Sequence, residues 1–215
     1  MANDRATVPR LSRAEAKAET RRRLLEAAET VFRREGYHRA SLDRIAAEAG
    51  FTTGAVYSTF DSKADVMLAL LAARAERRRA VWTEVLDSAS TVEDFVTEVA
   101  RRYAREVAAE HDWLAVASEF MIVVGRDEGL QPRYAALHEA GLAALTASIR
   151  TWLRRYGERA TIEPRRVARV VAALNRGLVL EGLVAPAEVP EELIVEANLA
   201  LLRGARGGEE KEAGR

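Results

Sequence analysis

The chain has 215 residues, of which 33 are Lys or Arg and 33 are Asp or Glu, so its formal net charge is zero. Hydrophobic residues make up 48% of the chain and none is cysteine, which excludes a disulfide framework, a cysteine metal site and thiol catalysis. No apolar run approaches the ~20 residues of a membrane-spanning helix, and the first residues lack an apolar signal region, so we expect a globular, cytoplasmic protein with no membrane partner.

The sequence pattern predicts an all-α protein. Alanine, leucine, arginine and glutamate, which have high helix propensity, are abundant, and no proline lies between Pro9 and Pro132. No segment alternates apolar and polar residues in the way that a half-buried strand does. We expect residues 1–18 to form a flexible arm, or at most a helix extension, and residues 204–215 to form a disordered tail.

Glycines and capping residues divide the first part of the chain into three short helices. The first is expected at 20–35 and ends at Gly36, which favours a left-handed stop. The second covers 41–50 and begins with Ser41, a good N-cap. The third covers about 52–60, after a tight turn.

Six longer helices are expected in the remainder of the chain. Their starts are marked by capping residues or by proline in the first turn, and their ends by glycine or proline. The expected ranges are about 62–86, 90–110, 112–124, 132–156, 164–184 and 190–202.

Residues 41–60 have the spacing of a helix-turn-helix, with the turn at Gly50. Val56 and Phe60, four positions apart, are expected to face the core. The opposite face of this helix is small and uncharged, which suits close approach to another surface, although an ordinary three-helix corner has the same spacing. Residues 1–63 carry 12 Lys or Arg against 9 Asp or Glu, a weak indication of an anionic partner.

A larger set of residues near the N-terminus has a specific order and spacing: Thr20, Ala27, Ala28, Phe32, Gly36, Tyr37, Ser41, Ile45, Ala46, Ala49, Gly50, Phe51, Thr52, Gly54, Val56, Tyr57, Phe60, Ser62 and Lys63. In this set the chain resembles the DNA-binding domain of the TetR family of bacterial transcription regulators. The match covers about a quarter of the chain. It implies a helix-turn-helix DNA-binding domain at 19–63 and an all-helical ligand-binding and dimerisation domain at 64–203.

The resemblance also implies which residues contact DNA. Backbone phosphates would be held by Ser41, Thr52, Tyr57 and Lys63, and the long base-reading side chain would be Arg44. The residues against the major groove would be Thr53, Gly54, Ala55, Ser58 and Thr59. Because this helix has no Arg, Lys, Asn or Gln, bidentate base contacts are missing there. We therefore expect readout through thymine methyl groups, Arg44 and DNA shape.

For the second domain, the resemblance makes a mostly apolar pocket plausible. Three aromatic and two polar residues are the candidate ligand contacts: Trp113, Phe120, Tyr134, His138 and Asn175. The last two helices carry more apolar surface than a small core can hide, which favours a homodimer with a four-helix interface. The candidate interface residues are Leu174, Leu178, Leu193, Ala197 and Leu201.

Together with these patterns, the resemblance implies a homodimeric repressor that releases a palindromic double-stranded operator when a small lipophilic or aromatic inducer binds. An activator of the same family, or a helical adaptor without specific DNA binding, remain alternatives. Catalysis is not expected. The single Glu-x-x-His, from Glu35 to His38, lacks the second motif of a di-iron site, and three histidines without cysteine leave little for a metal. No cofactor is expected.

Overall fold

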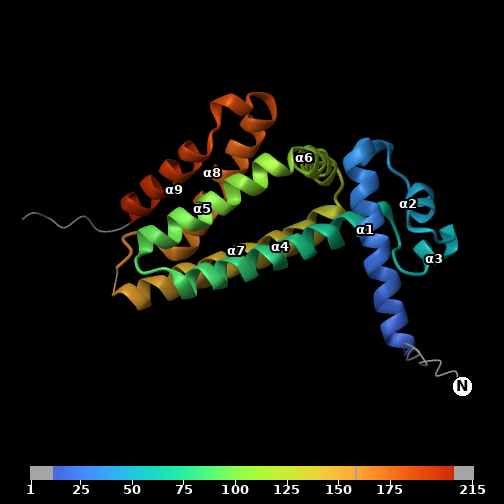
Figure 1. The fold of residues 1–215 in the computed structure, drawn as a ribbon, viewed down its shortest axis with the longest axis horizontal. Helices are drawn as coiled ribbons and strands as arrows, with labels where there is room; N and C mark the ends of the chain where they lie inside the picture. The colour runs from blue at the N-terminus through green and yellow to red at the C-terminus, as the bar shows by residue number, and fades with distance from the viewer. Residues whose placement is uncertain (1–11, 158, 206–215) are drawn as a thin grey trace, which may run out of the picture. The chain divides into compact units, whose positions relative to one another are not determined.

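The computed structural model describes residues 12–157 and 159–205 (Figure 1). Within these ranges the chain forms nine α-helices and one short 3₁₀-helix, with no β-strand. The predicted all-α fold is confirmed. None of the described helices is both long and apolar enough to cross a membrane.

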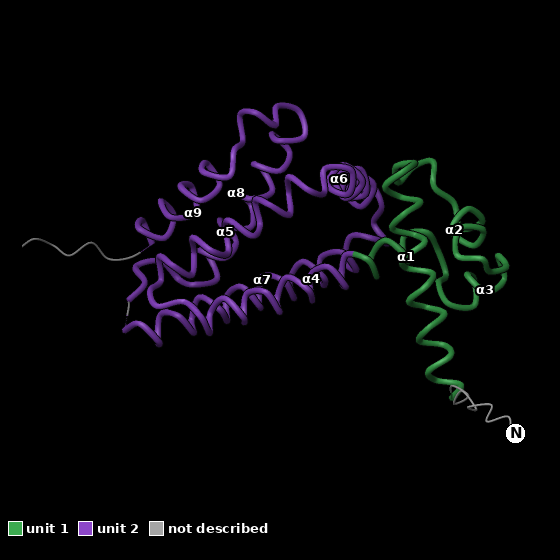
Figure 2. Tube along the Cα trace, in the orientation of Figure 1, with its two compact units in different colours: residues 1–70 green, residues 71–215 purple. Residues whose placement is uncertain are grey.

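The chain divides into two compact units, residues 1–70 and 71–215 (Figure 2). The division falls inside a single helix, α4 (Lys63–Ser88), whose first two turns belong to the first unit. The sequence had placed the boundary between residues 63 and 64, at the start of this helix. The difference arises because Val66, Met67 and Leu70 are buried, so the helix contributes core residues before it leaves the first unit.

The first helix, α1 (Arg13–Arg39), is longer at both ends than the sequence predicted. A capping box between Ser12 and Glu15 starts it inside the segment that was expected to be an arm. At the other end Gly36 has φ 77°, so the helix kinks there instead of stopping. Residues 13–18 are thus a helix extension, and the rest of the expected arm lies outside the described residues.

Helices α2 (Leu42–Ala49) and α3 (Thr53–Tyr57) form the predicted helix-turn-helix. Gly50 adopts the left-handed conformation with φ 69°, which ends α2 and turns the chain. The hydroxyl of Thr52 then accepts a hydrogen bond from the backbone N–H of Ala55 and caps α3. The core of the unit consists of large apolar side chains that are at most 4% exposed: Leu24, Val31, Phe32, Ile45, Val56, Phe60, Val66 and Met67.

The second unit contains the rest of α4 and the helices α5 (Val92–Ala109), α6 (His111–Gly125), α7 (Leu130–Tyr156), α8 (Pro164–Val184) and α9 (Glu191–Ala205), with the 3₁₀-helix η1 (Pro186–Glu188) before α9. Helix α5 packs along α9, and α7 packs along α8. The main core cluster is at most 5% exposed and consists of Val85, Val92, Phe95, Leu142, Ile149, Trp152, Ala168 and Leu202. The expected tail from Gly204 begins as the last turn of α9, and residues 206–215 lie outside the described residues.

Candidate nucleic-acid interface and ligand cavity

The outward face of α3 is small and accessible. Val56 and Phe60 point inward and are 0% and 4% exposed, whereas Tyr57 is 57% exposed. A Cβ atom added to Gly54 would meet only the Thr52 hydroxyl, at 3.8 Å, so the fold itself does not require glycine there. Because Gly54 has no side chain and lies on an accessible face of α3, another surface can come close to the helix there.

The hydroxyl groups predicted to contact DNA fall into two sets. Ser41 and Thr52 accept hydrogen bonds from backbone N–H groups as helix caps, so their own protons can still be donated to a phosphate. Ser58 and Thr59 instead donate to the carbonyl of Ala55, over 2.8 and 3.0 Å. These two side chains therefore offer a methylene and a methyl group outward, which fits apolar contact with a base better than a polar one.

Arg44 is tied to the first helix. Its Nη1 atom lies 2.5 Å from a carboxylate oxygen of Glu35, although the Arg44 side chain is 59% exposed. Glu35 is only 13% exposed, and it also pairs with Arg34 at 3.1 Å. The hydrogen bond from Arg44, helped by Arg34, holds the pKa of Glu35 below its ordinary value. To reach a base edge, Arg44 must leave this carboxylate.

Thr53, the other residue expected at the groove, is also held within the protein. Its hydroxyl donates to the carboxylate of Asp43 in α2, over 2.9 Å. The bond fixes the start of α3 against α2, and it leaves the Thr53 methyl group as the part that can meet a base.

Lys63 has a structural role that the sequence did not indicate. Its ammonium donates to the carbonyls of Tyr37, His38 and Ala40 over 2.7, 3.1 and 2.9 Å and lies 4.5 Å from the centre of the Tyr37 ring. The resemblance implies a phosphate contact for this lysine. The kink at Gly36 instead turns carbonyl groups toward it, and an ammonium group has three protons for three acceptors.

Two arginines of α1 that were not in the predicted set brace the helix-turn-helix. Arg23 donates to the carbonyl of Ala49 over 3.0 Å and lies over the ring of Phe51, and Arg21 lies over the ring of Phe60. All three contacts join α1 to the helix-turn-helix or to the residue that follows it closely, and they depend on how these elements pack. Spacing along the sequence gave no sign of them.

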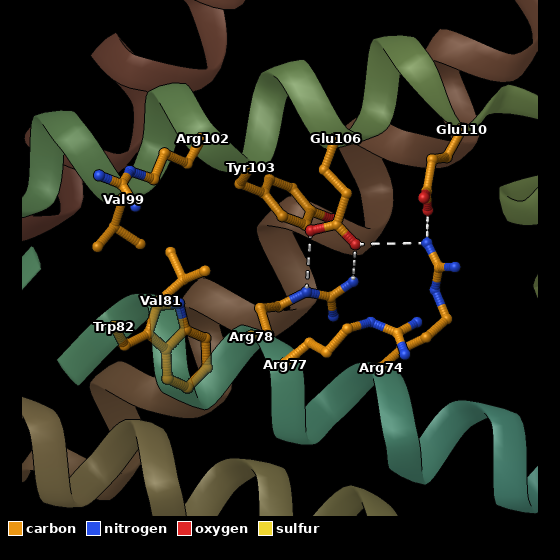
Figure 3. Close-up of a pocket in the computed structure, with 10 residues that line it drawn as sticks. All are labelled: Arg74, Arg77, Arg78, Val81, Trp82, Val99, Arg102, Tyr103, Glu106 and Glu110. Atoms are coloured by element: carbon orange, nitrogen blue, oxygen red, sulfur yellow. Dashed lines mark hydrogen bonds and ion pairs between the residues drawn. The ribbon is translucent and has the colours of Figure 1, made fainter. Parts of the chain in front are cut away.

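The second unit contains a cavity of about 260 Å³ between α4 and α5 (Figure 3). One end holds Val81, Trp82 and Val99 with Arg102 beside them, and the other end is formed by charged side chains, among them Arg74 and Glu110. The complete lining is Arg74, Arg77, Arg78, Val81, Trp82, Val99, Arg102, Tyr103, Glu106 and Glu110. Within the described residues, no group of three or more His, Asp or Glu side chains is placed to hold a metal ion.

A network of ion pairs joins the charged walls of the cavity. Arg78 donates to both oxygens of Glu106, over 2.9 and 3.3 Å, and Arg74 pairs with Glu110 and, at 3.6 Å, with Glu106. Burial alone would lower the pKa of Arg78, but its bonds to Glu106 raise it. Burial alone would raise the pKa of Glu106, but the two arginines bring it below its ordinary value. Burial also raises the pKa of Tyr103, so its hydroxyl stays neutral.

The cavity includes none of the five residues that the sequence suggested as ligand contacts. Phe120, Tyr134 and His138 do lie together, with ring centres 6.4 and 6.5 Å apart, but Phe120 is fully buried as a core residue. Trp113 is 2% exposed and lies under the guanidinium of Arg74, at 4.6 Å. The amide of Asn175 forms two reciprocal hydrogen bonds with Asn198, over 3.0 and 3.1 Å, and is satisfied by α9.

The cavity residues that sequence reasoning missed carried a partial signal. Arg74 and Arg78 are four apart on α4. Glu106 lies on α5, and Glu110, four positions later, directly follows the end of that helix. Two complementary pairs of equal spacing can form a ladder between two helices. The sequence does not show which helices pack together, so these ion pairs between two helices could not be predicted.

Exposed apolar residues form a stripe along α8. Val170, Leu180 and Val184 are 49%, 42% and 85% exposed, and Ala173 and Gly177 continue the same face. Among the predicted interface residues, Leu193 is 37% exposed. The others are partly buried, and Leu178 packs against the cluster around Ala100, Ala104 and Ile194. The exposed apolar face of α8 is therefore adjacent to the helix face that carries Leu174 and Leu178, which the sequence predicts to be the dimer interface.

Family models match both parts of the chain. The model of bacterial regulatory proteins of the tetR family matches residues 24–70. The model of the C-terminal region of BetI-type transcriptional repressors matches residues 106–205. The first match contains the helix-turn-helix, and the second contains α6 to α9 and the end of α5.

Individual relatives agree with these matches. The chain is 51% identical over 65 residues to the HTH-type transcriptional regulator TtgW of Pseudomonas putida, which covers 30% of this chain and 48% of that protein. It is 29% identical over 161 residues to the transcriptional activator FasR of Mycolicibacterium smegmatis, covering 63% of this chain and 73% of FasR. The chain thus spans about half the length of TtgW.

The fold is also similar to solved structures. The regulator FadR of Bacillus subtilis, in complex with stearoyl-CoA, superposes with a TM-score of 0.66 at 16% identity, covering 87% of this chain and 98% of that one. This similarity concerns the fold, and the two family models identify the family. The chain belongs to the TetR family of bacterial regulatory proteins, whose members are transcriptional regulators and not enzymes.

Proposed function

We propose that the protein is a transcriptional repressor that binds a partly palindromic DNA duplex as a homodimer and leaves it when a small molecule binds the cavity between α4 and α5. The observation that carries the proposal is the outward face of α3, where Gly54, Ser58 and Thr59 leave no bulky or charged side chain between the helix and a partner. A DNA groove accepts such a helix closely.

The contacts to DNA follow from the hydrogen bonds of the free protein. Ser41 and Thr52 keep a hydroxyl proton for a phosphate, and the exposed Tyr57 offers a third hydroxyl. Arg44 supplies the long side chain for a base once it leaves Glu35. Phosphate contacts fix the register of the protein, and the face of α3 reads methyl groups and groove shape.

A second copy of the chain would cover the stripe on α8. Val170, Leu180 and Val184 are exposed apolar side chains in the helical register of one face, with small residues between them. Two such faces related by a two-fold axis bury each other. The dimer would present two α3 helices to half-sites about 34–36 Å apart, or to a multiple of that distance.

Release by a ligand requires that the ligand bind one conformation of the dimer better than the other. Helix α4 contributes turns to the first unit and also lines the cavity from Arg74 to Trp82, so a change in the cavity can act on the start of the same helix. FadR, whose fold is similar, holds stearoyl-CoA, which favours ligand binding by this architecture. Coupling of about 1–3 kcal/mol would change DNA affinity roughly 5- to 150-fold.

The direction of regulation is supported by the match of residues 106–205 to BetI-type repressors. An activator is the second candidate, because FasR is named as an activator and matches a larger share of this chain than TtgW does. Transcription from a template that carries the selected duplex separates the two. Addition of the protein lowers the transcript if it is a repressor and raises it if it is an activator.

Selection from a library of random duplexes tests the DNA-binding part. The wild type should enrich a partly palindromic sequence. Gly54→Glu should enrich nothing although it remains folded, because a Cβ fits at this position but a carboxylate would face the DNA. Thr30→Glu places the same charge on an exposed part of α1 and should enrich the wild-type sequence. An adaptor protein would give no enrichment with any of the three proteins.

A further inference from the structure

We propose that the cavity between α4 and α5 binds a compact aromatic carboxylate, whose ring lies against Trp82 and whose anion pairs with Arg77. The proposal rests on the function proposed above and deepens it by naming the chemical class of the effector. It follows from three properties of the cavity: its hydrogen-bonding capacity, its apolar end and its volume.

Both acidic side chains of the cavity already form ion pairs with arginines. Both oxygens of Glu106 accept hydrogen bonds from Arg78, and Glu110 pairs with Arg74. A cationic ligand would have to take a carboxylate away from a buried or half-buried guanidinium. Arg74 is 6% exposed, so removing its partner would leave a charge with little solvation, which is strongly unfavourable.

The basic side chains, by contrast, keep donors to spare. Arg102 uses Nε and Nη1 for Glu98 and Glu84, over 2.8 and 3.1 Å, which leaves Nη2. Arg77 lines the cavity, and within the described parts of the chain its guanidinium forms neither an ion pair nor a hydrogen bond. A guanidinium presents planar, paired donors that match a carboxylate. The cavity therefore has unused capacity for an anion and little for a cation.

The end of the cavity that holds Trp82, with Arg102 beside it, is suited to an aromatic body. Val81, Trp82 and Val99 lie together there, and the ring of Tyr103 lies between them and the Glu106 pair (Figure 3). The Tyr103 hydroxyl donates to the carbonyl of Asn175 over 3.4 Å, so it is engaged with α8. Aromatic rings pack favourably against indole and phenol rings.

The volume limits the size of the ligand. About 260 Å³ lies slightly below the range of roughly 300–1,000 Å³ that is usual for small-molecule sites. A molecule with one or two fused rings and a carboxylate fills such a space. A long acyl chain with a nucleotide head would not fit without opening the walls.

Calorimetric titration of the full chain with three compounds of equal shape tests the charge preference. The anion 2-naphthoate should bind at least about tenfold more tightly than neutral 2-naphthamide, a difference of about 1.4 kcal/mol. The cation 2-naphthylmethylammonium should bind more weakly than the anion. Equal binding of the anion and the amide, tighter binding of the cation, or no binding of any of the three would overturn the proposal.

Two variants of α4 test the anchor. Arg77→Gln should weaken 2-naphthoate about tenfold and leave 2-naphthamide unchanged. Arg79→Gln is the matched control, because Arg79 is two positions away, pairs with Glu76 and does not line the cavity. Equal affinity of the two variants for 2-naphthoate would contradict the role of Arg77.

The same protein samples, used in the duplex selection, separate this inference from the proposed function. Enrichment of a duplex without binding of 2-naphthoate would refute the ligand class alone. Binding of 2-naphthoate without any enrichment would refute the regulator instead.

Discussion

At the scale of single residues, the proposed contact of Arg44 with a base depends on its ion pair with Glu35. Both guanidinium groups that pair with Glu35, those of Arg44 and Arg34, belong to the first unit, and Glu35 is mostly buried beneath them. Glu35→Gln removes the charge that retains Arg44. We expect this variant to bind the selected duplex several-fold more tightly, because no ion pair has to be broken first.

Glu48→Gln is the control for this prediction. Glu48 pairs with Arg34 at 2.9 Å but not with Arg44. Fluorescence anisotropy with a labelled duplex measures both dissociation constants. If the two variants bind DNA equally, Arg44 is not restrained by Glu35.

Lys63 is predicted to act on stability more than on DNA affinity. Lys63→Met leaves the carbonyls of Tyr37, His38 and Ala40 without their shared donor, which should lower the free energy of unfolding by about 1–3 kcal/mol. Lys17→Met changes an exposed lysine of α1 in the same way and should have no such effect. Urea unfolding followed by circular dichroism measures both.

DNA binding gives a second readout for Lys63. If Lys63 stayed on its carbonyls in the complex, the folded Lys63→Met variant would keep the wild-type dependence of log affinity on log salt. If it contacted a phosphate instead, the slope would become shallower by about 0.9. A shallower slope with unchanged stability would contradict the structural role.

At the scale of helices, the network between α4 and α5 makes stability depend on pH. The pKa of Glu106 in the folded protein lies below its ordinary value of 4.5. Above pH 4.5 the carboxylate is charged in both states and its pairs with Arg78 and Arg74 contribute fully. The contribution decreases as the pH falls below 4.5 and is lost once the pH passes the lower pKa of the folded state.

Glu106→Gln should therefore destabilise the protein at pH 7, by about 1–3 kcal/mol. The difference between the stabilities of the variant and the wild type should become smaller as the pH falls below 4.5. Thermal unfolding at several pH values checks this. Glu84→Gln, which alters an exposed pair with Arg102, is the control. A difference that stays constant between pH 7 and pH 3 would show that Glu106 acts by packing and not by charge.

The limits of sequence reasoning also lie at this scale. Ser41, Gly50 and Thr52 act on backbone groups within a few residues, so their caps and turn were predictable. The start of α1 was missed because the capping box of Ser12 and Glu15 lies in a polar segment without an apolar stripe. The cavity was missed because Arg78 and Glu106 are 28 residues apart, and only the packing of α4 on α5 brings them together. The pairing of Asn175 with Asn198 could not be predicted, because the two residues lie on different helices.

At the scale of the whole molecule, the proposed dimer depends on the stripe of α8. Leu180→Glu puts a charge into the middle of this stripe and should give a monomer that binds the duplex at least tenfold more weakly. Ile162→Glu is the control, since Ile162 is 43% exposed, close to the 42% of Leu180, but lies before α8. Analytical ultracentrifugation at micromolar concentration measures the association. A dimer that persists in Leu180→Glu would place the interface elsewhere.

The proposed function depends on recognition of a DNA sequence by α3. The most direct test is the dissociation constant of the wild-type protein for the selected duplex and for a scrambled duplex of the same composition, measured over a range of salt concentrations. Specific recognition predicts affinity at least about 10³-fold higher for the selected duplex near physiological salt. If the affinities for the two duplexes are equal and decrease together as the salt concentration rises, the protein binds only the phosphate backbone. That result would contradict sequence recognition by α3.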